Sequence, residues 1–181
     1  NPFHYFADHE TELARLVCVG RTDFMRQFPR IESFEEGSAV PDPADYKTFE
    51  KCKLNWQEVE TNRHIISLHR DLIQLRQKDR IIAAQDKRAI EGSVLGPEAF
   101  TLRWYDEDDD DRLLMVNLGR DLDFQSLADP LLAAPRNMNW AVKWSSEDPR
   151  YGGVGTPPFI GKLWHAPGHT AVLLAAVPSN S

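Results

Sequence analysis

The spacing of hydrophobic residues along the chain changes near residue 85. Upstream, apolar residues recur three and four positions apart, which is the period of a helix with one buried face. Downstream, short apolar runs alternate with turns rich in glycine and proline, which is typical of antiparallel strands. We therefore predict an α+β chain, with a helical segment over residues 1–84 and a small antiparallel β-sandwich over residues 85–181.

The first helix is expected to begin at Asp8 or His9. It should end at Phe28, because Pro29 disfavours helical backbone in the residue before it. The stretch over residues 31–43 contains glycine and proline and is expected to be a loop. A short second helix is then expected over residues 45–51.

The clearest helical pattern follows Asn55, which together with Glu58 resembles a capping box. Its apolar positions form one stripe, and an amphipathic helix of this kind needs a partner surface. Left bare, the stripe would favour self-association, so we expect the helix to pack on the β domain or the chain to form an oligomer. The stripe consists of Ile65, Leu68, Leu72 and Leu75.

Five strands are expected in the second segment, and six consecutive acidic residues (106–111) separate the first two. These acids lack the glycine and the final glutamate of an EF-hand loop, so a solvated hairpin tip is favoured over a calcium site. The expected strands cover residues 100–105, 112–117, 140–144, 161–164 and 170–177.

The composition excludes several classes of protein. The 181 residues include 28 acidic and 21 basic ones, for a formal net charge of −7, and no basic face suggests a nucleic-acid partner. The longest apolar run is far shorter than the roughly 20 residues of a membrane span, and the chain opens without a signal-peptide pattern. Cys18 and Cys52 fit neither a disulfide framework nor a zinc motif. We expect a cytoplasmic protein without a membrane partner, and Asn1 in place of Met suggests a piece of a longer chain.

No catalytic motif stands out from the residues alone. The chain has no G-x-S-x-G elbow, no P-loop and no dinucleotide-binding fingerprint. His64 and His69 are five residues apart and do not share a helix face, whereas His165 and His169 flank a turn without a third ligand. Carboxylates are plentiful, but no pair is singled out as a glycosidase pair would be. We therefore expect no metal and no cofactor.

Four stretches resemble motifs of one enzyme family, and they occur in the family's order. They read NPFHYFADH followed by ELA from residue 1, DPADYKTFEKCKLNW from residue 42, LHRDLIQLR from residue 68 and WSSEDPRYGG followed by GTPP from residue 144. Each is similar to a motif of the malto-oligosyltrehalose trehalohydrolases, in the α-amylase superfamily (glycoside hydrolase family 13). The last run favours this family over the related glycogen branching enzymes.

The resemblance implies that the chain is the C-terminal part of such an enzyme. The helix around residues 68–76 would be the last helix of a (β/α)8 barrel, and a C-terminal β domain would follow. The parent would hydrolyse the α-1,4 bond next to the terminal trehalose of maltooligosyltrehalose, with retention at the anomeric carbon. The motifs of the family's catalytic Asp, Glu and Asp are absent from this chain, so no catalytic residue is assigned and the chain alone is expected to be inactive.

The resemblance places residues 1–9 after the eighth barrel strand, where loops line the active-site mouth. Tyr5, Phe6, Asp8 and His9 are then the candidate substrate-binding residues, through ring stacking and hydrogen bonds to hydroxyl groups. The alternative, which we favour, is that the aromatic rings pack and that Asp8 caps the next helix. For the EDPRYGG run, a local turn that joins the β domain to the barrel is favoured over a sugar site.

Two other functions remain open. The chain could belong to a glycogen branching enzyme relative, or it could be a stand-alone carbohydrate-binding or interaction module, as its five tryptophans suggest. The expected partner is maltooligosyltrehalose or an α-glucan, bound through the parent barrel.

Overall fold

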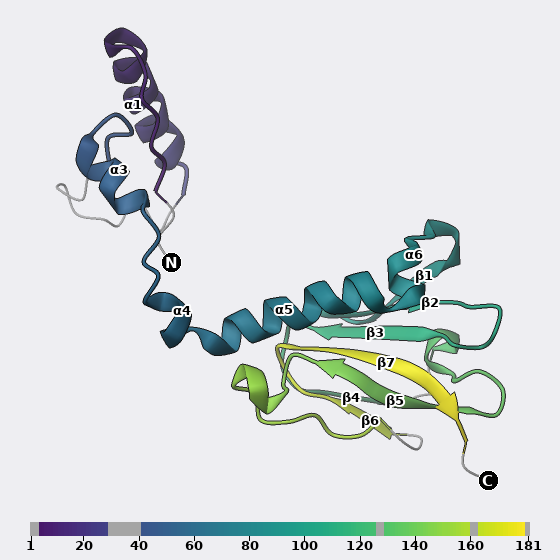
Figure 1. Cartoon of the computed structure of the whole chain (residues 1–181). Helices are drawn as coiled ribbons and strands as arrows, with labels where there is room; N and C mark the ends of the chain where they lie inside the picture. Colours follow the sequence, from purple (N-terminus) through teal and green to yellow (C-terminus); the bar gives the residue numbers. More distant parts are fainter. Residues whose placement is uncertain (1–3, 29–40, 126–128, 160–162, 180–181) are drawn as a thin grey trace. The chain divides into compact units, whose positions relative to one another are not determined.

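The computed structural model describes residues 4–28, 41–125, 129–159 and 163–179. They form two compact units, residues 1–58 and residues 59–181 (Figure 1). The sequence pattern placed the change of character near residue 85. The structure instead groups the long amphipathic helix with the sheet, because its side chains bond to residues of the β domain. Within the described ranges, no helix is long and apolar enough to cross a membrane.

The described part of the first unit contains helices α1 (Thr11–Met25) and α3 (Tyr46–Cys52). The prediction that α1 begins at Asp8 or His9 is wrong, because the amide of His9 donates to the carbonyl of Ala7, and Glu10 takes the N-cap position. Helix α3 agrees with the prediction to within one residue at each end. Its start is fixed by Asp45, whose carboxylate accepts a hydrogen bond from the amide of Lys47. Most of the predicted loop over residues 31–43 lies outside the described residues.

The helical pattern that follows Asn55 forms two helices where the sequence predicts one. Helix α4 (Glu58–Thr61) is separated from α5 (Arg63–Lys78) by Asn62. The carboxamide oxygen of Asn55 accepts a hydrogen bond from the amide of Gln57, as a capping residue does. A short helix α6 (Arg80–Ala84) and a 3-10 turn η1 (Lys87–Ala89) lead into the sheet.

The β domain contains a five-stranded antiparallel sheet of order β1-β2-β3-β7-β5 and a two-stranded antiparallel pair, β4-β6. The prediction of a helical segment followed by an antiparallel β domain is confirmed. Strand β3 has the predicted bounds, whereas β1 and β4 were not predicted. The strands are β1 (Ile90–Gly96), β2 (Ala99–Trp104), β3 (Arg112–Asn117), β4 (Leu122–Gln125), β5 (Met138–Ser145), β6 (Leu163–Ala166) and β7 (Thr170–Pro178), with 3-10 turns η2 (Pro130–Leu132) and η3 (Pro149–Tyr151).

The main core lies between the two sheets. Leu113 and Leu174 are fully buried there, and Trp164 from β6 packs its ring on Phe159 at 5.4 Å between centroids. The opposite face of the large sheet carries a second apolar row. Each member lies opposite the next on the neighbouring strand. The row consists of Leu102, Leu114, Leu173 and Trp144. Helix α5 lies over this second face, so the sheet is covered on both sides (Figure 1).

The acidic run between β2 and β3 is only in part the solvated tip that the sequence predicts. Glu107, Asp108 and Asp109 are exposed at the hairpin. Asp111, however, is 3% exposed, and its carboxylate accepts two hydrogen bonds from Arg103, at 2.6 and 2.9 Å. A charge can be buried in this way because a guanidinium neutralises it and fills its acceptor sites.

Candidate functional site

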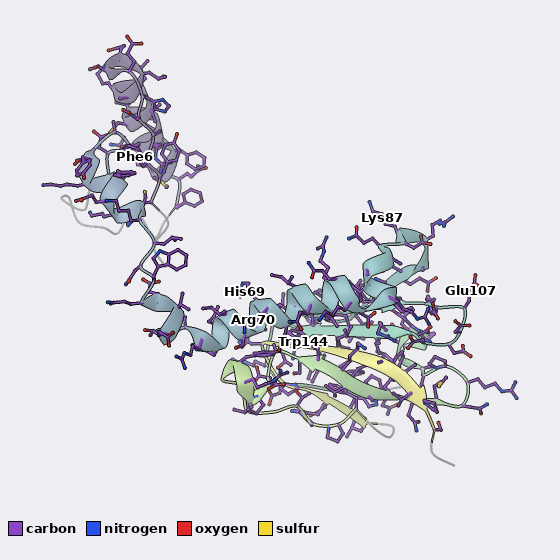
Figure 2. The ribbon with its side chains drawn as sticks, in the orientation of Figure 1. Phe6, His69, Arg70, Lys87, Glu107 and Trp144 are labelled. Atoms are coloured by element: carbon purple, nitrogen blue, oxygen red, sulfur yellow. The ribbon has the colours of Figure 1, made fainter. Side chains whose placement is uncertain are left out.

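The four candidate residues near the N-terminus lie in the first unit. Phe6 packs on Phe49 of α3, with 5.1 Å between ring centroids (Figure 2). The Tyr5 ring is 39% exposed and lies 4.4 Å from the guanidinium carbon of Arg21. Asp8 is exposed and His9 half-buried, and neither caps α1. The structure thus brings Phe6 into a packing contact and leaves Tyr5 and Asp8 open to solvent. Their contact with sugar stays a prediction.

The EDPRYGG run forms a joint between the β domain and α5. Asp148 caps η3 by accepting a hydrogen bond from the Arg150 amide at 2.9 Å, and it also binds the Arg150 guanidinium at 2.9 Å. The other end of that guanidinium reaches Asp71 of α5, at 3.0 Å. Tyr151 donates its hydroxyl proton to the same Asp71 carboxylate, at 2.5 Å. The prediction that this run forms a local turn is confirmed, and Arg150 is paired within it.

The two glycines of this run are required by the turn that follows η3. Gly152 has φ = 88°, in the left-handed region that favours glycine. A Cβ atom on Gly153 would lie 2.3 Å from the backbone of Glu147, which is closer than real contacts allow. The chain folds back there, and the amide of Gly155 donates to the carbonyl of Glu147 at 2.7 Å. The sequence of the run is therefore explained by a compact turn.

The electrostatics of the joint are those of a structural contact. Burial raises the pKa of the Tyr151 phenol, and the hydrogen bond to Asp71 raises it further. Hydrogen bonds from the Arg150 side chain and amide lower the pKa of Asp148. Tyr151 therefore stays protonated and Asp148 ionised at neutral pH. The Tyr151 hydroxyl is bonded to Asp71 and the Asp148 carboxylate to Arg150, which suits a fixed joint better than proton transfer.

A second joint attaches the α5–α6 corner to the sheet. Asp79 caps α6 with hydrogen bonds from the amides of Ile81 and Ile82, and it receives Arg112 of β3 at 2.8 Å and Lys143 of β5 at 3.2 Å. Burial pushes the pKa of Asp79 upward, but the hydrogen bonds from Arg112, Ile82 and Lys143 outweigh it, and the net pKa is lowered. The carboxylate is thus held in its charged form within the fold.

Comparison with known proteins points to one enzyme. Residues 87–173 match the family model described as a domain of unknown function, DUF3459. Malto-oligosyltrehalose trehalohydrolase of Deinococcus radiodurans is 34% identical over 126 residues, which cover 66% of this chain and 19% of that protein. The enzyme of the same name from Mycobacterium tuberculosis is 38% identical over 89 residues, 46% of this chain and 14% of that protein. This chain is a relative of the C-terminal part of malto-oligosyltrehalose trehalohydrolase.

The chain thus spans about a fifth of the length of the first of these trehalohydrolases. The region that matches the family model runs from η1 to the middle of β7 and so includes the EDPRYGG joint. No solved structure matches the chain.

Two hollows beside Trp104 were not predicted from the sequence of this trehalohydrolase relative. One, of about 460 Å³, lies between α5, α6, η1 and the sheet, and Trp104 and Trp144 line it. The other, of about 300 Å³, is more polar and is lined by Arg80, Asp106 and Tyr105 among others. Trp104 of β2 and Trp144 of β5 lie on the sheet face that α5 covers. The tryptophans were the feature of the sequence that pointed to a binding surface.

The described ranges contain no group of three His, Cys, Asp or Glu side chains that could hold a metal ion. His165 pairs with Asp123 at 2.8 Å on the β4-β6 pair and lies 3.9 Å from Asp121, in an exposed setting.

Proposed function

We propose that this chain is the C-terminal segment of an enzyme that cleaves the α-1,4 bond next to the terminal trehalose of maltooligosyltrehalose and so releases trehalose. The similarity to named trehalohydrolases supports this, as does the order of the four motifs. The substrate would be bound by the parent barrel, and this segment would contribute at most the loop with Tyr5, Phe6, Asp8 and His9.

We further propose that the role of this segment is stabilising, and one observation carries this. Asp71 lies in the LHRDLIQLR helix, which by resemblance is the last barrel helix, and it binds both Arg150 and Tyr151 of the β domain. A helix held at its side by two hydrogen-bonding groups loses orientational freedom. The β domain would thereby fix the last helix of the barrel and support the active site from outside.

The experiment is a chimera. The corresponding segment of the Deinococcus radiodurans trehalohydrolase is replaced by this chain, and release of trehalose from maltooligosyltrehalose is measured. We expect an active chimera and no release by the 181-residue chain alone. Arg150→Gln with Tyr151→Phe should lower the midpoint of thermal inactivation of the chimera, whereas Arg136→Gln, at an exposed arginine outside the joint, should not.

Two outcomes would contradict the proposal. Release of trehalose by the isolated chain would show that the chemistry does not need a barrel. A folded chimera that forms α-1,6 branches and releases no trehalose would favour the branching-enzyme alternative.

A carbohydrate-binding role is the second candidate, and the hollow of about 300 Å³ favours it. Sugar sites combine ring faces with groups that bind hydroxyls, and here Trp104 and Tyr105 lie beside Arg80 and Asp106. Titration of the chain with maltooligosaccharides tests this role. Millimolar or tighter binding that Tyr105→Ala weakens would support it, and no binding would leave the stabilising role alone.

A further inference from the structure

The hollow of about 460 Å³ in the β-domain unit is an open groove of the size that binds small molecules. Leu114 and Leu173 of the central strands form its floor, beneath Leu72 and Leu75 of α5. Figure 2 shows Trp144 near α5 and Lys87 near α6, and both residues line the groove. Both indole rings, Trp104 and Trp144, face this space. We call it the α5 groove.

The α5 groove is apolar inside and cationic at its edge. Arg76, Gln85 and Lys87 are the lining residues with polar side chains besides the two indoles. In the described part of the chain, neither Arg76 nor Lys87 has a carboxylate within ion-pair distance. Arg80 and Arg112 of the same unit, by contrast, are paired with carboxylates. In a chain of net charge −7, two unpaired cations beside one apolar cavity are free to bind an anion.

We propose that the α5 groove binds a small organic anion with an apolar body, an aliphatic or aromatic carboxylate. The body would lie against Trp104 and Trp144, and the carboxylate would meet Arg76 and Lys87. A neutral sugar fits this lining less well, because most of its hydroxyls would lose water and find no partner. The charges favour a carboxylate over an uncharged apolar side chain of a second copy. The inference does not depend on the proposed function.

The test compares an acid with its uncharged ester. Decanoate and methyl decanoate are titrated against the 181-residue chain by calorimetry, and quenching of indole fluorescence reports on the groove. We expect one site for decanoate and binding of the ester that is weaker by about three- to tenfold, because the ester forms no ion pair. Arg76→Gln with Lys87→Gln should weaken decanoate to the level of the ester and leave the ester unchanged.

Arg70→Gln is the matched control, since Arg70 lies exposed on the same helix but does not line the groove. It should leave both affinities as they are. Leu72→Trp fills the groove and should remove binding of both ligands, with circular dichroism to check the fold. If that variant does not fold, the charge variants still decide.

Equal affinity for acid and ester, or an unchanged affinity in the Arg76/Lys87 variant, would overturn the proposal. So would light scattering that shows a dimer which Leu72→Trp disperses, because the groove would then hold a second copy.

Discussion

Tyr151 donates a hydrogen bond to Asp71 across 80 positions of sequence, and this contact links the β domain to helix α5. The bond is 2.5 Å long, and Tyr151 is 7% exposed. Asp71 also receives Arg150, so a single carboxylate of the helix holds two residues of η3. The position of the helix over the sheet therefore depends on side-chain bonds as well as on its apolar stripe.

Tyr151→Phe should destabilise the β-domain unit by about 1–1.5 kcal/mol, the value of one partly buried hydrogen bond. The ring remains and still packs near Trp144, so packing is kept while the bond is lost. Urea unfolding followed by tryptophan fluorescence measures the change. Tyr105→Phe is the matched control, because the Tyr105 hydroxyl is exposed and makes one long bond of 3.3 Å to Glu91. An equal effect of the two variants would contradict the role assigned to Tyr151.

Gly153→Ala should destabilise the same unit by more than about 2 kcal/mol, because its Cβ would collide with backbone atoms of Glu147, which cannot move aside as a side chain can. Gly152→Ala should cost only about 1 kcal/mol, from its positive φ, since no atom lies within 4 Å of its Cβ. The order of the two unfolding midpoints checks the prediction. Gly20→Ala, in α1 with open space around it, should instead raise helicity.

Local patterns predict elements where one segment determines its own structure. Residues 112–117 form a strand as predicted, because four consecutive apolar side chains, bounded by polar residues, fit a sheet on their own. Strand β1 was missed because Gly92 and Gly96 interrupt its pattern and its register shifts between Val94 and Gly96. Strand β4 has only four residues, LDFQ, and is defined by its pairing with β6.

The candidate site was harder to predict because its contacts are long-range. The EDPRYGG turn can be recognised in the sequence, but its partner Asp71 cannot. In the sequence, Asp71 looks like any solvent-facing residue of an amphipathic helix. The burial of Asp111 was missed because its partner Arg103 lies on the neighbouring strand β2, and only the folded hairpin brings the two side chains together. The α5 groove arises only when α5, α6 and the sheet come together.

Asp111→Asn should destabilise the β domain by about 3 kcal/mol, because it leaves the Arg103 guanidinium buried without a counter-charge. Both side chains are at most 7% exposed, so water cannot replace the lost carboxylate. Asp109→Asn is the control from the same hairpin: Asp109 is exposed with φ = 60°, which asparagine tolerates, so its effect should be near zero. Thermal unfolding of the two variants compares them, and equal melting temperatures would show that the acidic run acts only as a solvated tip.

The stability of the β domain should fall on acidification, partly through Asp79. The folded state lowers the pKa of Asp79, because bonds from Arg112, Ile82 and Lys143 outweigh the opposing effect of burial. A lowered folded pKa means that the folded state binds its proton less tightly than the unfolded chain. The stabilisation is therefore present above the unfolded value, about 3.9, and is lost as the pH falls through it towards the folded pKa.

Asp79→Asn isolates this contribution, because asparagine can still cap α6 but carries no charge for Arg112 and Lys143. The variant should be less stable than the unmodified chain at pH 7, and the gap should narrow as the pH is lowered from about 5 to about 3. Urea unfolding at several pH values measures the gap, and the other acidic groups cancel because both chains contain them. Asp86→Asn, at an exposed carboxylate beside Arg88, should show a much smaller gap at every pH. A gap for Asp79→Asn that stays constant down to pH 3 would mean that the Asp79 charge contributes nothing and that only its capping or its shape matters.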